Sequence, residues 1–249
     1  MTSNLFCHCV FFSPPVTLNL KSDIVDIWQA CLDVDQSIFR QFGSMISTEE
    51  RQRASRFHFE RDRRRFVVSR GILRILLGRY LHTAPDRIQF RYGTEGKPAL
   101  ASDEADVRFN LSHSDSMALF GFTRGREIGI DLEKIRPEVP SQGLAELVFS
   151  ISELRAWRSL PAHQQPEAFF TNWTRKEAYV KAMGKGMSFP IKNLTILPGG
   201  SRALIEGTAY RDEAPRWSVN QLDLGSEYAA ALAVEGNDWS LRCWSLELS

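Results

Sequence analysis

The stretch REIGIDLEKIRP, residues 126–137, places two carboxylates among residues that are typical of a buried strand. Successive side chains of a strand alternate between its faces, so Asp131 and Glu133 share one face while Ile130 and Leu132 share the other. Acids on a buried face need a cation, an arginine or solvent. On this stretch alone, the simpler interpretation is an edge strand with a solvated polar face.

Similar patterns lie on both sides of this strand. Before it, the sequence predicts a strand, a helix start, a long helix and two strands at 23–34, 47–50, 65–81, 107–114 and 117–123. After it, a helix start, a long helix, a turn and strands follow at 150–153, 166–183, 198–200 and 217–236. This repetition predicts an α/β (α+β) pseudo-dimer of two similar halves, 16–123 and 124–249, behind an N-terminal extension, 1–15. Each half is expected to be a small antiparallel-rich sheet packed on a long helix.

Composition and charge limit the kind of protein. With 249 residues, 43% of them hydrophobic, and a net charge of +1, the chain is expected to be globular with a sizeable core. Arginine is unevenly distributed, because ten arginines lie between Arg51 and Arg79 against two acids, Glu60 and Asp62. This excess predicts an anionic partner, either a phosphate-bearing ligand or an acidic protein.

The N-terminal residues and the cysteines bear on the compartment. Cys7-His8-Cys9 has no second ligand pair for a zinc site, and the four cysteines form no disulfide framework. We expect residues 1–20 to be a loose lead-in, and the apolar run at 5–12 is too short to span a bilayer. The sequence therefore predicts a cytoplasmic protein in a reducing compartment, with no membrane partner.

The segment FFTNWTRKEAYVKAMGKG, residues 169–186, places an acid within an apolar stripe. At 100° per residue, Glu177 falls between Trp173 and Val180, although a solvated glutamate would lie on the opposite face. Lys181, four residues on, is an ordinary helix-stabilising partner. That pairing explains Lys181, but it does not explain why Glu177 faces inward, so a stronger partner is expected.

A polar cluster occurs in LSHS, residues 111–114. Ser112, His113 and Ser114 lie at a strand end, where they could donate hydrogen bonds to phosphate oxygens. No acid lies close by in sequence for a catalytic triad, and there is no G-x-S-x-G motif. A polar hairpin corner explains the cluster equally well.

Together these residues predict a reaction class. Asp131, Glu133 and Glu177 would supply oxygen ligands to Mg²⁺, which one or two carboxylates usually hold together with substrate phosphates and water. With Lys97, Lys181, His113 and the arginine-rich helix added, the site would suit a substrate diphosphate in which one P–O bond breaks. The two common nucleotide-binding motifs, a P-loop and G-x-G-x-x-G, do not occur.

The order EGKP, NLSHS, GIDLE and WTRKEAYVKAMGKG resembles the 4'-phosphopantetheinyl transferases of the Sfp type. The resemblance implies a monomeric pseudo-dimer with the active site in the cleft between its halves. It implies transfer of 4'-phosphopantetheine from coenzyme A to a serine of an apo acyl or peptidyl carrier protein, releasing adenosine 3',5'-bisphosphate. Mg²⁺, with Mn²⁺ as an alternative, is the implied cofactor, and neither nucleic acid nor membrane is an expected partner.

The resemblance also assigns catalytic roles. Asp131, Glu133 and Glu177 match the metal ligands, and Asp131 and Glu177 are also catalytic, with Glu177 as the base for the carrier serine. Lys181 matches the lysine that stabilises charge on the leaving phosphate, and Lys176 matches a neighbour at the pyrophosphate.

The remaining assignments concern coenzyme A. The implied contacts are the phosphate-binding pair Ser112 and His113, the turn residues Lys97 and Pro98 over the nucleotide, and Arg53 and Arg65 near the 3'-phosphate. Glu50 departs from the family pattern, since it stands where some relatives have a lysine. The 3'-phosphate contacts are therefore expected to be shared among Arg51, Arg53 and Arg56.

Two other functions stay open on the sequence. The same acids would serve a Mg²⁺-dependent hydrolase of a nucleotide diphosphate, which needs no carrier protein. The arginine-rich helix would suit a nucleic-acid binder, although Phe57, Phe59 and Phe66 are the only rings close to it in sequence. If a carrier is served, it is expected to dock on the second half, around 138–160.

Overall fold

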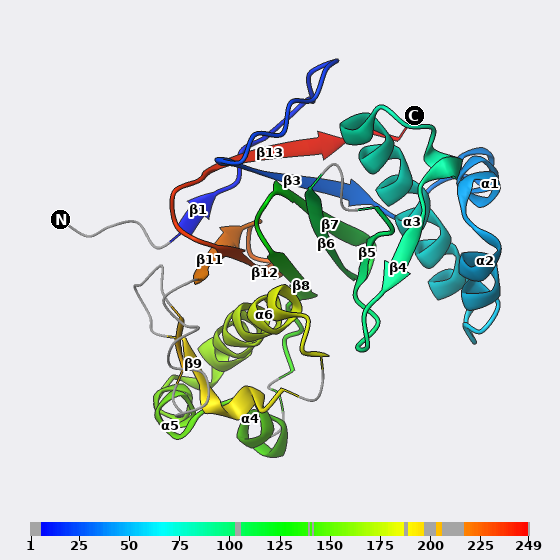
Figure 1. The fold of residues 1–249 in the computed structure, drawn as a ribbon. Helices are drawn as coiled ribbons and strands as arrows, with labels where there is room; N and C mark the ends of the chain where they lie inside the picture. The colour runs from blue at the N-terminus through cyan, green and yellow to red at the C-terminus, as the bar shows by residue number, and fades with distance from the viewer. Residues whose placement is uncertain are drawn as a thin grey trace.

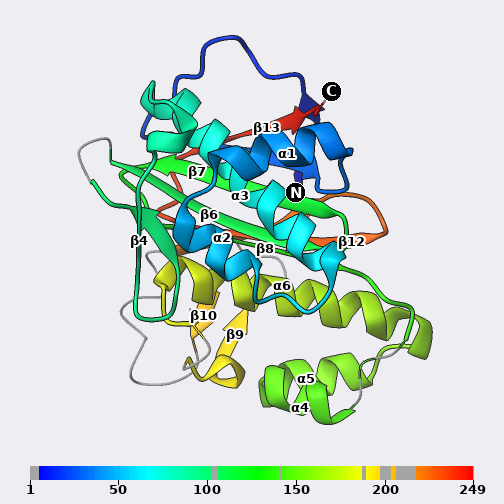
Figure 2. The same ribbon diagram turned by 90° about the vertical axis from the view of Figure 1, so that its right-hand side faces the viewer.

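The computed structural model describes residues 6–102, 106–138, 140, 142–186, 189–196, 203–205 and 217–248. The molecule contains two main sheets, each packed against a long helix (Figures 1 and 2). The predicted mixed α/β class is confirmed. The predicted turn at 198–200 lies outside the described residues.

The first sheet has five strands in the order β2-β13-β3-β7-β6. Their bounds are Phe11–Phe12, Ser240–Leu246, Ile24–Cys31, Met117–Arg124 and Val107–Ser114. β3, β7 and β6 pair antiparallel, whereas β13 runs parallel to both β2 and β3. The last strand of the chain therefore lies beside the first long one.

Helix α3 (Glu60–Leu81) covers one face of this sheet. Val68, Ile72 and Leu76 recur every fourth residue and are fully buried, because that spacing places them on one helix face. The shorter helices α1 (Gln36–Met45) and α2 (Thr48–Ala54) pack against α3. A 3-10 turn (Pro85–Arg87) and the hairpin of β4 (Phe90–Tyr92) and β5 (Pro98–Leu100) follow.

The second sheet has four strands in the order β1-β11-β12-β8. Their bounds are Phe6–His8, Trp217–Asp223, Tyr228–Glu235 and Ile128–Lys134. Helix α6 (Gln165–Met183) packs on it, preceded by α4 (Gln142–Val148), α5 (Ile151–Arg158) and a 3-10 turn (Ala162–Gln164). Another 3-10 turn (Ile191–Asn193) and the pair β9 (Leu194–Ile196) and β10 (Ala203–Ile205) follow α6.

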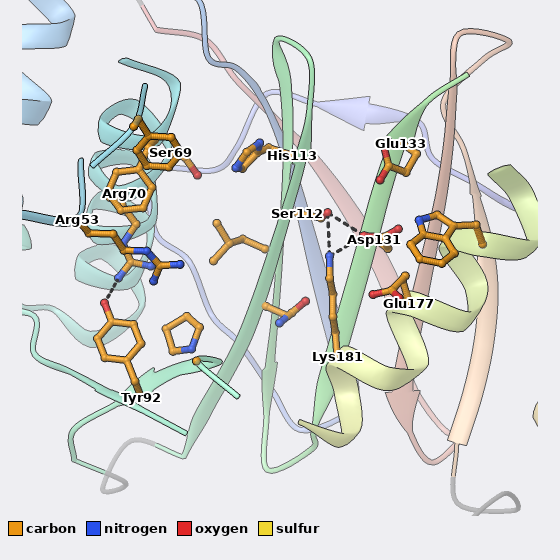
Figure 3. Close-up of a pocket in the computed structure, with 17 residues that line it drawn as sticks. Arg53, Ser69, Arg70, Tyr92, Ser112, His113, Asp131, Glu133, Glu177 and Lys181 are labelled. Carbon is orange, nitrogen blue, oxygen red and sulfur yellow. Dashed lines mark hydrogen bonds and ion pairs between the residues drawn. The ribbon is translucent and has the colours of Figure 1, made fainter. Parts of the chain in front are cut away.

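The glycine of GIDLE fixes how closely β8 approaches α6. A Cβ at Gly129 would overlap the backbone of Ala178 and Ala182, so only glycine fits there. This close approach brings the carboxylate of Asp131, two residues further along β8, to the same region as Glu177 on α6 (Figure 3).

The two sheets meet where edge strand β6 lies against edge strand β8. The Asn110 side chain accepts a hydrogen bond from the Ile130 N–H at 2.9 Å, and Ser114 Oγ accepts one from the Lys134 N–H at 3.0 Å. In the first sheet β7 lies between β3 and β6, and in the second sheet β12 lies between β8 and β11. The line between β6 and β8 is where residues of the two sheets come together.

The N-terminal segment differs from the prediction of a loose lead-in. β1 pairs with β11 at the edge of the second sheet, and β2 pairs with β13 at the edge of the first. Leu18 and Leu20 are buried in the core under α3. The prediction failed because short strands that add to an existing sheet edge carry little periodicity of their own. Within the described ranges, every helix is too short or too polar to cross a membrane.

Candidate active site

A cleft of about 430 Å³ opens along the line where β6 and β8 meet, between α3 and α6 (Figure 3). The segments that form its walls lie between Arg53 and Lys181 in the sequence. The lining residues are Arg53, Phe57, Phe66, Ser69, Arg70, Tyr92, Gly96, Pro98, Asn110, Leu111, Ser112, His113, Asp131, Glu133, Trp173, Glu177 and Lys181. The cleft therefore gathers most of the residues that the sequence singled out.

The centre of the cleft is an ion pair between β8 and α6. The Lys181 ammonium donates to Asp131 Oδ1 at 2.6 Å and to Ser112 Oγ at 3.0 Å, and the Ser112 hydroxyl donates to the same Oδ1 at 3.0 Å. Asp131 is only 4% exposed, and its other oxygen, Oδ2, is buried without a hydrogen-bond partner. A buried carboxylate oxygen without a donor is costly, which makes Oδ2 a candidate ligand for a cation.

Two further acids flank Asp131. Burial and the Asp131 carboxylate raise the pKa of Glu133, although a hydrogen bond from Ser114, the Lys181 charge and Trp173 oppose the shift. Burial, followed by Asp131, raises the pKa of Glu177, with Lys181 opposing and Glu133 adding to the rise. The site thus concentrates negative charge that a cation would relieve.

The acids do not form a closed metal cage by themselves. In the described part of the chain, no three His, Cys, Asp or Glu side chains are gathered closely enough to hold a metal ion alone. Mg²⁺ typically takes one or two carboxylates and completes its shell with substrate phosphates and water. Asp131 Oδ2, with Glu133 and Glu177 at hand, fits such an open site.

The opposite end of the cleft is basic. Figure 3 shows Arg53, Ser69, Arg70 and Tyr92 at this end, across β6 from the acids. Arg70 donates to Glu50 Oε1 at 2.5 Å and to the Tyr92 hydroxyl at 3.2 Å. The cleft is therefore polarised, with cations on the α3 side and carboxylates on the β8 and α6 side.

His113 lies in the cleft, and Arg65 lies beside it. Burial lowers the pKa of His113, and the charges of Lys181 and Arg65 add to this effect. Arg65 pairs with Asp33 at 2.7 Å and Asp115 at 3.1 Å. Arg65 lines a neighbouring depression that His113 also borders, so the structure places it next to the main cleft rather than in it.

Lys97 and Pro98 are separated by the structure. Pro98 lines the cleft, but the Lys97 ammonium turns away and donates to Glu127 at 3.1 Å and to the carbonyls of Ile128 and Ala182. Burial lowers the pKa of Lys97. Lys97 therefore braces the C-terminal end of α6 against β8, and the expectation that it contacts the nucleotide does not match its place.

Lys176 is a clear correction. The family resemblance implied a place at the pyrophosphate, but the Lys176 side chain is 0% exposed, and its ammonium pairs with Glu153 at 2.6 Å and donates to the Val148 carbonyl at 2.8 Å. One residue on a helix turns the side chain by about 100°, so Lys176 and Glu177 cannot share a face. Glu177 lines the cleft, while Lys176 lies beneath α5.

Glu50, which departs from the family pattern, lies outside the cleft lining. Its carboxylate is buried, accepts from the Ser47 N–H and pairs with Arg70 and Arg74. Burial opposes its ionisation, but Arg70, the Ser47 N–H and Arg74 together hold its pKa below the ordinary value. Of the three arginines expected to share the 3'-phosphate, Arg53 lines the cleft, whereas Arg51 and Arg56 are exposed and outside its lining.

Several lining residues were not predicted from the sequence. Trp173 was recoverable, since Trp173, Glu177 and Lys181 recur every four residues and share one helix face. Arg70 had no signal that set it apart from nine other arginines nearby. Tyr92 reaches the cleft only through a hairpin whose placement depends on tertiary contacts.

Comparisons with known proteins agree with this geometry. A family model described as the 4'-phosphopantetheinyl transferase superfamily matches residues 127–233, and one described as 4'-phosphopantetheinyl transferase, N-terminal, matches residues 28–121. The two matches fall on either side of the line between β6 and β8.

Individual relatives extend the similarity to most of the chain. The 4'-phosphopantetheinyl transferase HetI of Nostoc sp. is 39% identical over 232 residues, which are 92% of this chain and 95% of the relative. The 4'-phosphopantetheinyl transferase Sfp of Bacillus subtilis is 31% identical over 156 residues, 63% of this chain and 68% of the relative. Among solved structures, the holo-[acyl-carrier-protein] synthase of Thermotoga maritima aligns with 45% of this chain and 63% of its own, at 20% identity and a TM-score of 0.35.

Proposed function

Because the chain belongs to the 4'-phosphopantetheinyl transferase superfamily and is a phosphopantetheinyl transferase, we propose that it modifies a carrier protein. In this proposal it transfers the 4'-phosphopantetheine arm of coenzyme A to a serine of an apo acyl or peptidyl carrier protein and releases adenosine 3',5'-bisphosphate. The observation that carries the proposal is the Lys181–Asp131–Ser112 cluster, with Asp131 Oδ2 left without a partner in a polarised cleft.

The residues of the acidic end have separate parts in this reaction. Asp131, Glu133 and Glu177 would hold Mg²⁺, or Mn²⁺, which when bound supplies charge stabilisation to the diphosphate. The Lys181 ammonium, held at 2.6 Å from Asp131, would neutralise negative charge on the leaving phosphate. Ser112 and His113, on β6, would donate hydrogen bonds to the phosphate oxygens.

Glu177 is the proposed general base. Its raised pKa makes its carboxylate a stronger proton acceptor than an ordinary glutamate. The carrier serine oxygen would bond to the phosphorus that bears the pantetheine arm, while the P–O bond to the adjoining phosphate breaks. The serine proton passes to Glu177, directly or through a water molecule, and the electron pair leaves with adenosine 3',5'-bisphosphate.

The test is incubation of the protein with coenzyme A, Mg²⁺ and a panel of apo carrier proteins. We expect the mass of a carrier to rise by about 340 Da at its serine, with an equal amount of adenosine 3',5'-bisphosphate released. Cleavage of coenzyme A without gain of mass on any carrier would instead support a hydrolase.

Three buried arginines of the arginine-rich region support this proposal over a nucleic-acid binder. Arg65, Arg70 and Arg74 are buried and pair with carboxylates of the protein itself. A belt that bound a nucleic-acid backbone would present its cations to solvent. We therefore propose that the buried arginines serve the cleft and the core, and that neither nucleic acid nor membrane is a partner.

We also propose how the chain is organised and where the carrier docks. The shared strand order supports a pseudo-dimer of halves 16–123 and 124–249, active as a single cytoplasmic chain. Exposed Leu147 and Ile151 support carrier docking around 138–160, of which residues 139 and 141 lie outside the described residues. Light scattering at assay concentration would test the monomer, and a dimer mass would contradict it.

A further inference from the structure

We infer that Ser114 of β6 is a positioning residue that holds the Glu133 carboxylate in place to bind a divalent cation. This inference rests on the proposed function, in which Glu133 is one of the ligands of that cation. The sequence allows a phosphate contact for the Ser114 hydroxyl, whereas the structure directs the hydroxyl to a carboxylate of the protein itself. Ser114 is outside the cleft lining, so it would act through Glu133 rather than on the substrate.

The first argument is the way in which the two sheets are joined. β8 is an edge strand, and alternate residues of an edge strand direct their backbone N–H groups away from their own sheet. The Ile130 N–H donates to the Asn110 side chain at 2.9 Å. The Lys134 N–H donates to Ser114 Oγ at 3.0 Å. Polar side chains of β6 therefore join the two sheets at these points, and Ser114 is one of them.

The second argument is the direction of the single Ser114 hydroxyl proton. A serine hydroxyl has one proton to donate and lone pairs that accept. Because Ser114 Oγ accepts from the Lys134 N–H, its proton is left for another acceptor, and it donates to Glu133 Oε2 at 2.9 Å. The Trp173 side chain is a weaker second donor to the same carboxylate. A carboxylate that accepts such bonds is favoured in its ionised form, which is the form that binds a cation.

The third argument is that both acids of β8 are held by the same strand. Ser112 and Ser114 are two residues apart and share one face of β6, as Asp131 and Glu133 do on β8 (Figure 3). Ser112 Oγ donates to Asp131 Oδ1 at 3.0 Å, which matches the bond from Ser114 to Glu133. Asp131 is also held by the Lys181 ammonium at 2.6 Å. Glu133 has the longer side chain and more rotamers to lose, so a donor fixed by the backbone matters more for it.

The fourth argument is that the turn after Ser114 is anchored on both sides. Ser114 ends β6, and Asp115 follows with a φ of 52°. The Asp115 carboxylate accepts from Arg65 of α3 at 3.1 Å and from Lys134 of β8 at 2.7 Å. Arg65 is held in turn by Asp33 at 2.7 Å. The end of β6 is thus tied to the helix of the first sheet and to a strand of the second, which fixes the place of the Ser114 hydroxyl.

The experiment compares Ser114→Thr with Ser114→Val, because these β-branched side chains have similar shapes and only threonine keeps a hydroxyl. Mn²⁺ is titrated into each protein with coenzyme A present and carrier protein absent, and binding is followed by electron paramagnetic resonance. We expect Ser114→Thr to bind Mn²⁺ within about threefold of the unaltered protein and Ser114→Val to bind it about tenfold more weakly or worse, as is typical when a group that orients a metal ligand is lost. Equal Mn²⁺ affinity of the two variants would overturn the inference.

A second comparison tests whether Ser114 acts through Glu133. In a Glu133→Gln background, Ser114→Thr and Ser114→Val should bind Mn²⁺ equally, because the ligand that Ser114 holds is already lost. A purely structural serine would weaken Mn²⁺ binding in both backgrounds, and that result would count against the inference. Thermal unfolding in a metal chelator shows whether each variant is folded.

Two further variants serve as controls. Ser116→Ala changes the same turn outside the cleft lining, where the Ser116 carbonyl rather than its side chain accepts from the Leu32 N–H. It should leave the Mn²⁺ affinity unchanged. If Ser114→Val does not fold, Ser114→Ala removes the hydroxyl without adding bulk and should show the same loss of Mn²⁺ affinity.

Metal binding separates this inference from the proposed function. An unaltered protein that binds Mn²⁺ but modifies no carrier would refute the transfer, while a difference between Ser114→Thr and Ser114→Val would still support the role of Ser114. Transfer to a carrier with equal Mn²⁺ affinity in both variants would support the transfer and refute the role of Ser114. An unaltered protein that binds no Mn²⁺ in the presence of coenzyme A would refute both.

Discussion

The long helices α3 and α6 are each held by a capping-box glutamate of the preceding short helix, but the two glutamates pair with different basic residues. Ahead of α3, Ser47 and Glu50 form a capping box, and ahead of α6, Ser150 and Glu153 form another. Each capping glutamate also forms an ion pair with a buried basic side chain on the long helix that follows. Glu50 pairs with two arginines, whereas Glu153 pairs with Lys176.

The difference determines the charge that each helix brings to the cleft. On α3, one of the two arginines that share Glu50 lines the cleft, so this side delivers a cation. On α6, Glu153 and backbone carbonyls hold Lys176 in the interior, and its neighbour Glu177 faces the cleft instead. A repeated anchor thus supports opposite charges on facing walls, which is what a metal-assisted reaction of a polyphosphate needs.

The largest expected effect comes from removing the centre of the acidic wall. Asp131→Ala should lower turnover at least about 1,000-fold, because it removes both a proposed ligand and the partner of Lys181. Carrier modification followed by mass spectrometry measures the loss, and thermal unfolding checks the fold. Asp86→Ala, an exposed acid on the 3-10 turn after α3, is the control. Near-normal rates in Asp131→Ala would remove Asp131 from the site.

Breaking the buried ion pair between Lys176 and Glu153 should lower the stability of the protein. Lys176→Met leaves Glu153 buried without its cation, which we expect to cost about 3–5 kcal/mol, or roughly 6–20 °C in melting temperature. Replacing both partners, as Lys176→Met with Glu153→Met, should recover only part of the loss, because the apolar pair leaves no unpaired charge but deprives the Ser150 and Ile196 N–H groups of their acceptor. An unchanged melting temperature combined with a raised KM for coenzyme A would show that Lys176 contacts the substrate, as the family resemblance implied.

A smaller effect of opposite sign is expected at Glu177. Because its pKa is raised in the folded protein, ionisation of Glu177 weakens folding, and this cost grows as pH rises through its unfolded and then its folded pKa. Glu177→Gln removes the cost and should raise the melting temperature by about 2–4 °C at neutral pH, and by less at low pH. Mn²⁺ binding should weaken in the same variant.

The exposed Glu146, paired with Arg158, provides the control for this measurement. Glu146→Gln should leave the melting temperature within about 1–2 °C at every pH, because exposed ion pairs contribute little. If Glu177→Gln were less stable than the unaltered protein at neutral pH, the claim that ionised Glu177 weakens folding would be refuted.

Much of the fold could be predicted from local patterns. The two capping boxes marked the starts of α2 and α5, and alternation marked β3, β6, β7 and β8. The period of the strand or helix sets the face on which Asp131, Glu177 and Lys181 lie, and all three line one cleft. Such local periods are written in the sequence itself.

The errors arose where position depends on contacts between distant segments. The helical period directs the Lys176 and Glu177 side chains to different faces of α6. Only the position of α5 shows that the Lys176 ammonium forms an ion pair with Glu153. Lys97 is adjacent to a lining residue, yet the end of α6 captures its ammonium. The orientation of Arg70 depends on Glu50 and Tyr92, about twenty residues away on either side. None of these contacts leaves a periodic signal.

The pairing of β13 with β3 has a consequence for how the protein is made. Arg242 on β13 and Asp26 on β3, which form an ion pair, are 216 residues apart in sequence. At about 5–20 residues per second, β3 would leave the ribosome roughly 10–40 s before its partner exists. Throughout that interval one edge of the first sheet stays open to association with other chains. A C-terminal truncation that removed β13 would make this exposure permanent, so such a fragment should accumulate as aggregate.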